Sequence, residues 1–413
     1  MKKPYSNKRS MLALVGGLTM TASPCLFAGS PALTGLVAQA DNAESAFTAP
    51  AGMSRLKGTR ITVQTMYVQS FADFEVDENK TTIPGGNPEK GSDPTIIPSI
   101  YYVRELNDKW HAGLSLTVPS GFGSNYGNTW SGRYETVDFS LVYVALTPAV
   151  SYRVNDKLSL GGAVGFNYTS ETSELKIVQP LKEGDGKISS ELDGLGINVT
   201  LSLLYEFTDH TRAGISWTSD SDADLDGNVR LRKLGPVFDE VATELGIKNI
   251  NTELTNTLPQ RLLAGVYHEF DSGRYFTVDG LWMKFSDFSV SDIKLDGNNV
   301  NVNTPDIYND IYALTVGAGF PASDPRLTYK IGAMYVSEAV DNADRTFSIR
   351  LDKMWGMGAG VSYDLTSGNS VDLNATLINV GDASVDTASA LNQRVAGKND
   401  DPWALMFELS YHM

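Results

Sequence analysis

The sequence predicts an all-β fold, a transmembrane antiparallel β-barrel of about 14 strands. Three observations lead to this prediction. Apolar residues alternate with small or polar ones over segments of about ten residues, which is the length that a tilted strand needs to cross a bilayer. The polar faces of these segments are nearly free of charge. Short turns and long polar loops alternate strictly along the chain.

The clearest alternation lies between Lys157 and Tyr205. Two segments of this stretch each carry one apolar face, made of Leu158, Leu160, Gly162, Val164, Phe166 and Tyr168 in the first and of Leu195, Ile197, Val199, Leu201, Leu203 and Tyr205 in the second. The opposite faces are mainly Gly, Ser, Thr and Asn. A soluble sandwich would bury its apolar faces and present charge on the other side. We therefore expect the apolar faces here to touch lipid.

The connections between strands follow a regular order. Six short turns are expected, at 107–108, 155–156, 208–210, 271–273, 322–324 and 366–369. Seven long polar loops lie between them, near 72–96, 120–138, 170–193, 218–257, 287–306, 339–352 and 381–402. An even strand number with both chain ends on the short-turn side is typical of bacterial outer-membrane barrels, whose turns are periplasmic and whose loops are extracellular.

Composition agrees with a barrel and excludes one class of partner. The 413 residues include 38 Gly, 18 Tyr, 16 Phe and 6 Trp, and aromatic residues suit membrane interfaces. The net charge of -16 leaves no basic surface for nucleic acid.

The N-terminus has the pattern of a secretory signal peptide. Lys2, Lys3, Lys8 and Arg9 precede an apolar run and a stretch of small residues, so residues 1–28 are predicted to be removed on export. Residues 29–58 lack strand alternation and either extend into the periplasm or fold back into a lumen. Residues 59–413 are predicted to form the barrel.

Three ordered stretches resemble the FadL/TodX-type outer-membrane transporters of long-chain fatty acids and other hydrophobic compounds. They are Ala49-Pro50-Ala51-Gly52-Met53 ahead of the first strand, Trp130-Ser131-Gly132-Arg133-Tyr134 with Tyr152-Arg153-Val154-Asn155-Asp156, and Leu258-Pro259 with Leu263-Ala264-Gly265-Val266-Tyr267 and Trp282-Met283-Lys284-Phe285-Ser286. The chain departs from the family at Ala49, where Asn is usual, and at Phe285, where a second Trp is frequent.

The resemblance implies a monomeric barrel of 14 strands, with residues 29–58 forming a hatch inside the lumen. It also implies passive uptake and a sideways exit into the membrane. Movement of Pro50, Ala51, Gly52 and Met53 would open the hatch.

The loop after Trp217 is predicted to contain a short helix that captures the cargo. Gly235-Pro236 begins the helix and Gly246 ends it. Its apolar face, made of Val237, Phe238, Val241 and Leu245, either binds an alkyl chain or packs on the barrel rim. Arg133 or Arg232 is a candidate partner for a cargo carboxylate.

A second group of residues marks a candidate opening in the barrel wall, at Pro119, Gly121, Gly123 and Pro148. A proline inside a closed barrel removes a ladder hydrogen-bond donor and favours a bulge or gap. The alternative is that the third strand ends at Val118 and that Pro148 marks a bulge without function.

No metal, cofactor or catalytic site is predicted. Asp222, Asp224 and Asp226 match the start of a calcium loop, but Lys233 stands where the bidentate Glu is required. A solvated acidic hairpin is therefore expected, with irregular calcium binding as the alternative. His268-Glu269 begins a zinc-protease motif that Ser272 interrupts.

The sequence thus predicts an outer-membrane barrel that moves hydrophobic small molecules passively and contacts lipid and lipopolysaccharide. The cargo is a fatty acid, an alkane or an aromatic compound. The alternatives are a general porin for polar solutes and a surface receptor anchored by a barrel. An outer-membrane esterase is the enzymatic option.

Overall fold

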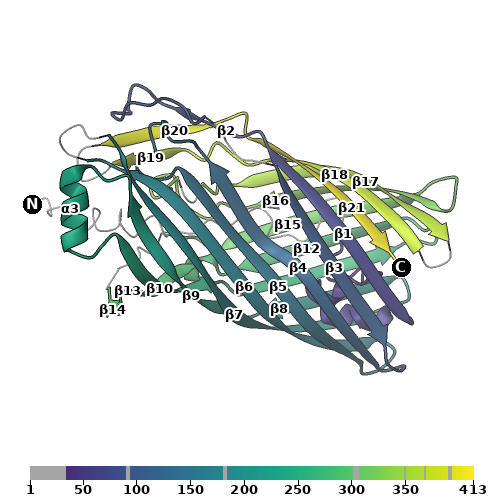
Figure 1. The fold of residues 1–413 in the computed structure, drawn as a ribbon. Coiled ribbons are helices and arrows are strands. Elements are labelled where there is room, and N and C mark those ends of the chain that lie inside the picture. The colour runs from purple at the N-terminus through teal and green to yellow at the C-terminus, as the bar shows by residue number, and fades with distance from the viewer. Residues whose placement is uncertain are drawn as a thin grey trace, which may run out of the picture.

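The computed structural model describes residues 34–89, 94–179, 184–300, 307–347, 350–366, 369–388 and 393–413. The predicted signal peptide lies outside these residues. Within them the chain forms one long tilted antiparallel barrel (Figure 1). No helix in the described part of the chain combines the length and the apolar character that crossing a membrane requires.

Fourteen strands form the closed wall, as the sequence predicts. In order around the barrel they are β1 (Thr59–Ser70), β3 (Thr95–Glu105), β4 (Trp110–Asn125), β5 (Asp138–Arg153), β6 (Leu158–Ile177), β7 (Gly186–Glu206), β8 (Thr211–Thr218), β11 (Arg261–Glu269), β12 (Tyr275–Met283), β15 (Ile311–Pro321), β16 (Leu327–Val336), β17 (Met354–Thr366), β18 (Asn369–Asn379) and β21 (Trp403–His412). The last strand pairs with the first, from Thr62 opposite His412 to Ser70 opposite Ala404.

The alternation of side chains explains why these segments form a membrane wall. Along β6 the residues at even positions from Leu160 to Tyr168 point outward and, apart from the glycine at 162, are exposed and apolar. The intervening side chains point into the lumen and are small or polar. A closed ladder leaves no unpaired edge in the hydrocarbon, which is the condition that a bilayer imposes on strands. The predicted period of two and the predicted direction of each face are therefore confirmed.

Three neighbouring wall strands continue beyond a break toward the long-loop end. β8 is followed by β9 (Ser221–Arg232), β10 (Asn249–Leu258) leads into β11, and β12 is followed by η6 (Phe285–Asp287), β13 (Ser289–Leu295) and β14 (Asn298–Asn299). β9 pairs with the upper part of β7. The interpretation of 218–257 and 287–306 as polar loops is therefore wrong, because strand pairing continues through much of both segments.

The other long loops form a cap over the same end of the barrel. β2 (Asp73–Val76), β19 (Val385–Ala388) and β20 (Arg394–Asp400) make a separate three-stranded sheet. Phe74, Trp130 and Phe347 are buried beneath it with ring centroids 5.0–6.1 Å apart. The described residues of the 381–402 loop thus contribute two paired strands and the buried Val385 and Val395 to this cap, and are not a purely solvated connection.

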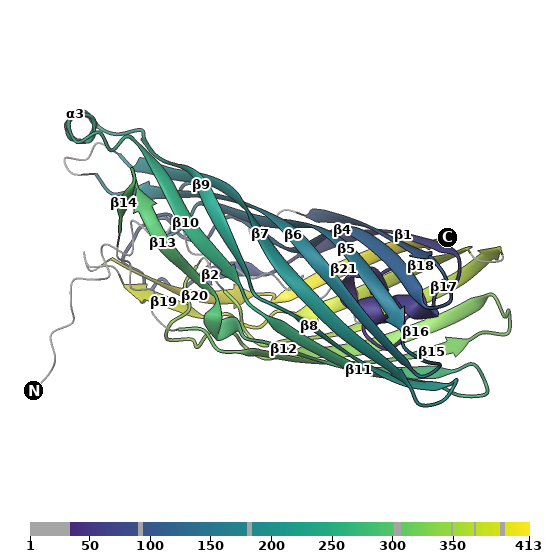
Figure 2. The same cartoon turned by 90° about the horizontal axis from the view of Figure 1, so that it is seen from below.

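The N-terminal segment lies inside the lumen at the opposite, short-turn end (Figure 2). It contains α2 (Ser45–Thr48) and η4 (Pro50–Arg55), whose residues are almost all buried. Of the two placements that the sequence left open for this segment, the structure shows the one inside the barrel.

Candidate functional site

The hatch, defined here as the described residues 34–58, is held to the wall by specific hydrogen bonds. The Ala51 amide donates to Ser202 Oγ at 2.8 Å, and Ser54 Oγ donates to Ser159 Oγ at 2.7 Å. The Arg212 guanidinium donates to the hatch carbonyls of Ala38 and Gln39 at 2.6 and 2.5 Å. Pro50, Ala51, Gly52 and Met53, the predicted gate residues, are all buried in this contact.

Glycines on the inner wall make room for the hatch. A Cβ on Gly161 would lie 2.1 Å from the Ala51 nitrogen and 2.4 Å from the Pro50 carbonyl carbon. A Cβ on Gly113 would lie 2.5 Å from the Met53 sulfur. The backbone of η4 therefore contacts the strand backbone closely, and any side chain at Gly161 would push it away.

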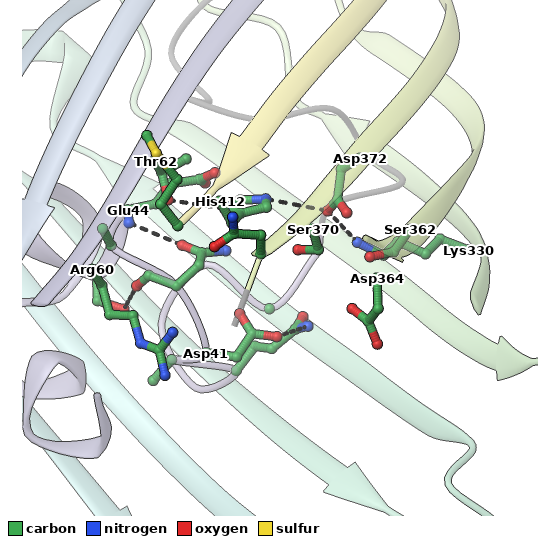
Figure 3. A pocket seen from close by; sticks show the side chains of 18 of the residues that line it. Asp41, Glu44, Arg60, Thr62, Lys330, Ser362, Asp364, Ser370, Asp372 and His412 are labelled. Carbon is green, nitrogen blue, oxygen red and sulfur yellow. Dashed lines mark hydrogen bonds and ion pairs between the residues drawn. The ribbon is translucent and has the colours of Figure 1, made fainter. Parts of the chain in front are cut away.

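A polar cavity of about 590 Å³ separates the other side of the hatch from the wall (Figure 3). Lys330 Nζ donates to Asp372 at 2.6 Å, and the His412 ring lies 3.6 Å from the same carboxylate and 2.9 Å from Thr62 Oγ1. Glu44 of the hatch faces this group. Burial raises the pKa of Glu44 to about 7, against the opposing effect of His412.

The lumen toward the long-loop end contains a large apolar cluster. It draws side chains from strands all around the barrel, and Phe285 of η6 stacks on Phe288 with ring centroids 4.9 Å apart. Glu171 points into this region between Leu141 and Leu192 of the neighbouring strands. The side chain is fully buried, and neither carboxylate oxygen has a partner among the described residues.

A small cavity of about 30 Å³ lies between this apolar cluster and the hatch. Phe47 of the hatch, Pro119 of β4 and Arg261 of β11 all line it. The cavity thus meets the hatch, the candidate wall opening and the breaks between β8 and β9 and between β10 and β11.

The β3–β4 ladder ends early beside Pro119, one of the residues of the predicted opening. The β3–β4 ladder runs from Glu105 opposite His111 to Ile100 opposite Leu116, and the described residues show no pair beyond it although both strands continue. The β4–β5 register shifts between Thr117 and Ser120, which places Pro119 in a bulge. Gly121 and Gly123 follow on the same strand.

Pro148 lies apart from this bulge. It is exposed on the lipid side of β5 opposite Leu114, and the β5–β6 register is the same on either side of it. The structure therefore places Pro119, Gly121 and Gly123 together at the interruption, with Pro148 lower on the neighbouring strand.

The predicted loop helix is present as α3 (Pro236–Glu244) at the tip of the β9–β10 hairpin (Figure 1). Gly246 ends it with φ +70°, and the amides of Gly246 and Ile247 donate to the carbonyls of Thr243 and Ala242. Three side chains of the predicted apolar face are exposed and Phe238 is half-buried. The exposed ones are Val237 at 46%, Val241 at 47% and Leu245 at 66%.

The two arginines proposed as carboxylate partners differ in their surroundings. Arg133 donates to Asp185, to the carbonyls of Pro84 and Trp130 and to the Tyr134 hydroxyl. Its donors are therefore committed to the loop structure. Arg232 is exposed at the end of β9.

The acidic candidates for calcium lie on a strand rather than in a loop. Asp222 and Asp224 accept hydrogen bonds from Thr257 and Thr255 of β10 at 2.6 and 2.8 Å. Asp226 follows two residues further along β9, so the three carboxylates are spread along the strand instead of converging. No group of three or more potential metal ligands is found in the described part of the chain.

Sequence reasoning missed several inward-facing charged groups, among them Glu44, Glu171 and Arg261. Alternation places Glu171 on the inner face of β6, but nothing in the sequence says that its lumenal surroundings are apolar. Arg261 lies two residues after Pro259 of the Leu258-Pro259 motif, and this nearness was the only sequence signal for it.

A family model described as outer membrane protein transport protein (OMPP1/FadL/TodX) matches residues 19–411. The chain belongs to this family. Like the rest of the family, it is an outer-membrane transport protein, with its short turns on the periplasmic side and its cap outside.

Individual relatives of this FadL/TodX family chain are distant but cover most of its length. It is 26% identical over 390 residues to the 47 kDa outer membrane protein of Pasteurella multocida, covering 88% of each chain. It is 20% identical over 373 residues to the long-chain fatty acid transport protein of Escherichia coli O6:H1, covering 84% of this chain and 83% of that one.

Solved structures support the same fold. A FadL homologue of Pseudomonas aeruginosa superposes with a TM-score of 0.81 at 20% identity, covering 99% of this chain and 98% of that one. The toluene transporter TodX of Pseudomonas putida gives a TM-score of 0.64 at 16% identity, covering 90% of this chain and 94% of that one.

Proposed function

We propose that this FadL/TodX family member takes up hydrophobic small molecules passively and releases them sideways into the outer membrane. The mature protein begins after residue 28, acts as a monomer and contacts outer-membrane lipid and lipopolysaccharide. The relatives suggest fatty acids and aromatic compounds as cargo, and alkanes are a third candidate class from the sequence alone.

Capture begins at α3. This helix lies at the outer tip of the molecule (Figure 2), where a hydrophobic solute arrives from water, and Val237, Val241 and Leu245 are exposed. Each methylene that moves from water into an apolar contact contributes about 0.8 kcal/mol. An alkyl chain can therefore exchange bulk water for this surface before it enters the lumen.

Passage continues through the apolar cluster to the top of the hatch. The cluster includes flexible and aromatic side chains such as Met283, Met334 and Phe285, which can repack around a guest. The hatch closes the lumen below, so cargo that reaches Phe47 either displaces η4 or leaves through the wall.

The observation that carries the proposal is the early end of the β3–β4 ladder beside the bulge at Pro119. Pro119 also lines the cavity above the hatch, so the interruption and the lumen meet at one residue. Because a hydrophobic molecule is more stable in lipid than in the periplasm, exit at this point needs no energy source.

A disulfide across the interruption tests the exit. Ser99 and Thr117 would form the next pair of the ladder after Ile100 opposite Leu116, so the double variant Ser99→Cys/Thr117→Cys is expected to close the wall when oxidised. Uptake of radiolabelled palmitate or hexadecane by cells that lack other carriers should fall on oxidation and return on reduction.

The matched control is Tyr102→Cys/Leu114→Cys, which bridges strands that are already paired. Oxidation should leave its uptake unchanged. Unaltered uptake by the cross-linked Ser99/Thr117 variant would rule out this exit, and ion conductance without uptake of either compound would favour a porin. If the protein showed neither uptake nor ion conductance, a surface receptor would be favoured.

A further inference from the structure

A row of cations crosses three neighbouring strands near the outer rim of the barrel. Lys187 of β7 lies directly opposite Lys176 of β6 on one side and Arg232 of β9 on the other. We call these three residues the outer basic row. Like charges directly opposite each other on one face of a sheet repel, so the row destabilises the ladder unless anions offset it.

The row is only partly neutralised within the protein. Glu174 pairs with both Lys187 and Lys176, lying 3.7 Å from Lys176 Nζ, so that one carboxylate serves two cations. Arg232 and its chain neighbour Lys233 are exposed, and no hydrogen bond or ion pair of either side chain is found in the described part of the chain. Positive charge therefore remains on this face of the sheet.

The row points sideways from the wall, above the part that touches lipid. On β7 the outward side chains are apolar from Tyr205 to Leu195 and become charged at Asp193. Lys187 is on the same face and further out, about 14 Å beyond Asp193 for a rise of about 3.3 Å per residue and a tilt of about 45°. The neighbours that meet this face are therefore the molecules of the outer leaflet and not solutes in the lumen.

The other face of the same strands is packed on apolar side chains. Leu175 of β6, Ile188 of β7 and Val229 of β9 form a small buried cluster behind the row. This packing fixes the three strands relative to one another. The cations therefore project from a rigid support at the spacing of neighbouring strands.

Carboxylates lie between the row and the bilayer. Asp193 is directly opposite Asp226, which is directly opposite Glu253, and all three side chains are exposed. They repel an anion at the lipid boundary, whereas the row attracts one further out. This charge pattern fits a partner whose negative groups extend beyond the lipid boundary. The outer leaflet contains such groups in the phosphorylated core sugars of lipopolysaccharide.

We propose that the outer basic row binds phosphate groups on the core sugars of lipopolysaccharide packed against the wall. This inference rests on the proposed function, in which the protein contacts lipopolysaccharide, and it assigns that contact to one face of the barrel. Guanidinium and ammonium groups form charge-assisted hydrogen bonds with phosphate oxygens. Because the row extends over three strands, it can contact more than one phosphate.

The test compares lipopolysaccharide that has a phosphorylated core with lipid A, which lacks the core. Binding of each to the purified full-length protein in a non-ionic detergent is measured for the wild type and for Lys187→Gln/Arg232→Gln. The double variant should bind the complete lipopolysaccharide about tenfold more weakly or worse at low salt. This difference should shrink at high salt, because ions screen exposed charges. The affinity for lipid A should be unchanged.

Two further variants serve as controls. Lys187→Arg/Arg232→Lys keeps both cations in the row and should bind complete lipopolysaccharide as the wild type does. Lys157→Gln/Arg274→Gln removes one lysine and one arginine from exposed positions in the short turns, and it should also bind as the wild type does.

Unchanged binding of complete lipopolysaccharide by Lys187→Gln/Arg232→Gln would overturn the proposal. Equal losses for complete lipopolysaccharide and lipid A would also overturn it, because they would show a general effect on lipid contact. Uptake of palmitate and hexadecane by cells with the wild-type protein separates this site from the proposed function. Row-dependent binding without uptake would refute only the uptake function, whereas normal uptake with binding that does not depend on the row would refute only the site.

Discussion

Single residues on the inner wall decide whether the hatch can sit in the barrel. Gly161 and Gly162 are neighbours on β6, yet a Cβ on Gly161 would overlap the η4 backbone, whereas a Cβ on Gly162 would meet nothing nearer than 3.6 Å. The period of two places one glycine in the lumen and the other toward lipid. An alanine at Gly161 would disturb both the hatch and the strand, whereas an alanine at Gly162 would affect only the strand. Comparing the two variants therefore separates the effect on hatch seating from the effect on strand stability.

We expect Gly161→Ala to loosen the hatch by about 1–3 kcal/mol, since overpacking against backbone cannot be relieved by a rotamer change. Hydrogen exchange of the Ala51 and Gly52 amides should become faster in this variant. Gly162→Ala should leave the exchange unchanged. Equal exchange rates in the two variants would contradict the close contact between η4 and β6.

The inward or outward direction of almost every wall residue could be predicted from the sequence, but its lumenal partner could not. Glu171 and Glu174 lie on the same strand, and only the fold shows that Glu171 is enclosed by Leu141 and Leu192 while Glu174 pairs with Lys187. Arg133 was a candidate partner for a cargo carboxylate because its real partner, Asp185, lies in a different loop and could not be identified from the sequence. The alternation of apolar and polar residues shows whether a side chain points inward or outward. Its contact partners depend on which strands and loops the fold brings together.

At the scale of elements, the hatch faces two different surfaces. One side is fixed by direct hydrogen bonds to β6, β7 and β8, and the other borders the polar cavity. On that second side Glu44 is packed near His412 of β21, Asp372 of β18, Lys330 of β16 and Asp41 of the hatch itself. A buried carboxyl there makes the seating of the hatch depend on pH.

The raised pKa of Glu44 fixes the direction of this dependence. In the seated hatch the pKa is about 7, against 4.5 in water, so protonation stabilises the seated state. This stabilisation is complete below pH 4.5 and is lost as the pH rises through 7. Protease cleavage within residues 34–58 should therefore increase over that range in the wild type.

Glu44→Gln removes the titrating group, and its hatch should resist protease at pH 7.5 as well as the wild type does at low pH. Glu191→Gln, on an exposed carboxyl of β7, is the control. A pH profile that Glu44→Gln leaves unaltered would assign the dependence to another group.

The existence of α3 and its ends could be predicted from Gly235, Pro236 and Gly246, because capping is a local property. The strands on either side could not, since β9 and β10 are rich in Asp, Asn and Thr and read as a solvated loop. Pairing with each other and with β7 overrides that composition. The break between β3 and β4 was indicated by Pro119, but its extent is visible only from the register.

At the scale of the whole molecule, the lumen is closed twice in series. The hatch lies in the periplasmic half, and the apolar cluster around Phe285 and Phe288 lies toward the outer end. A polar solute therefore meets a mainly apolar segment even where the hatch is absent. This arrangement differs from that of a general porin, whose lumen is lined by charge and filled with water.

Deletion of residues 34–58 should consequently produce little ion conductance in planar bilayers. A hydrophobic constriction stays dewetted, and ions cross it poorly. Combining the deletion with Phe285→Asp and Phe288→Asp should give steady conductance, because charge in the constriction admits water. Porin-like currents from the deletion alone would show that the apolar cluster does not seal the lumen.

The seam between β1 and β21 has a consequence for how the molecule is made. The wall can close only when β21 pairs with β1, and the hatch is joined directly to β1. We expect the hatch to be enclosed as this last pair of strands joins, since its chain already leads into one of them. Errors in seating it would then appear as a failure to complete the cylinder, well before any cargo is met.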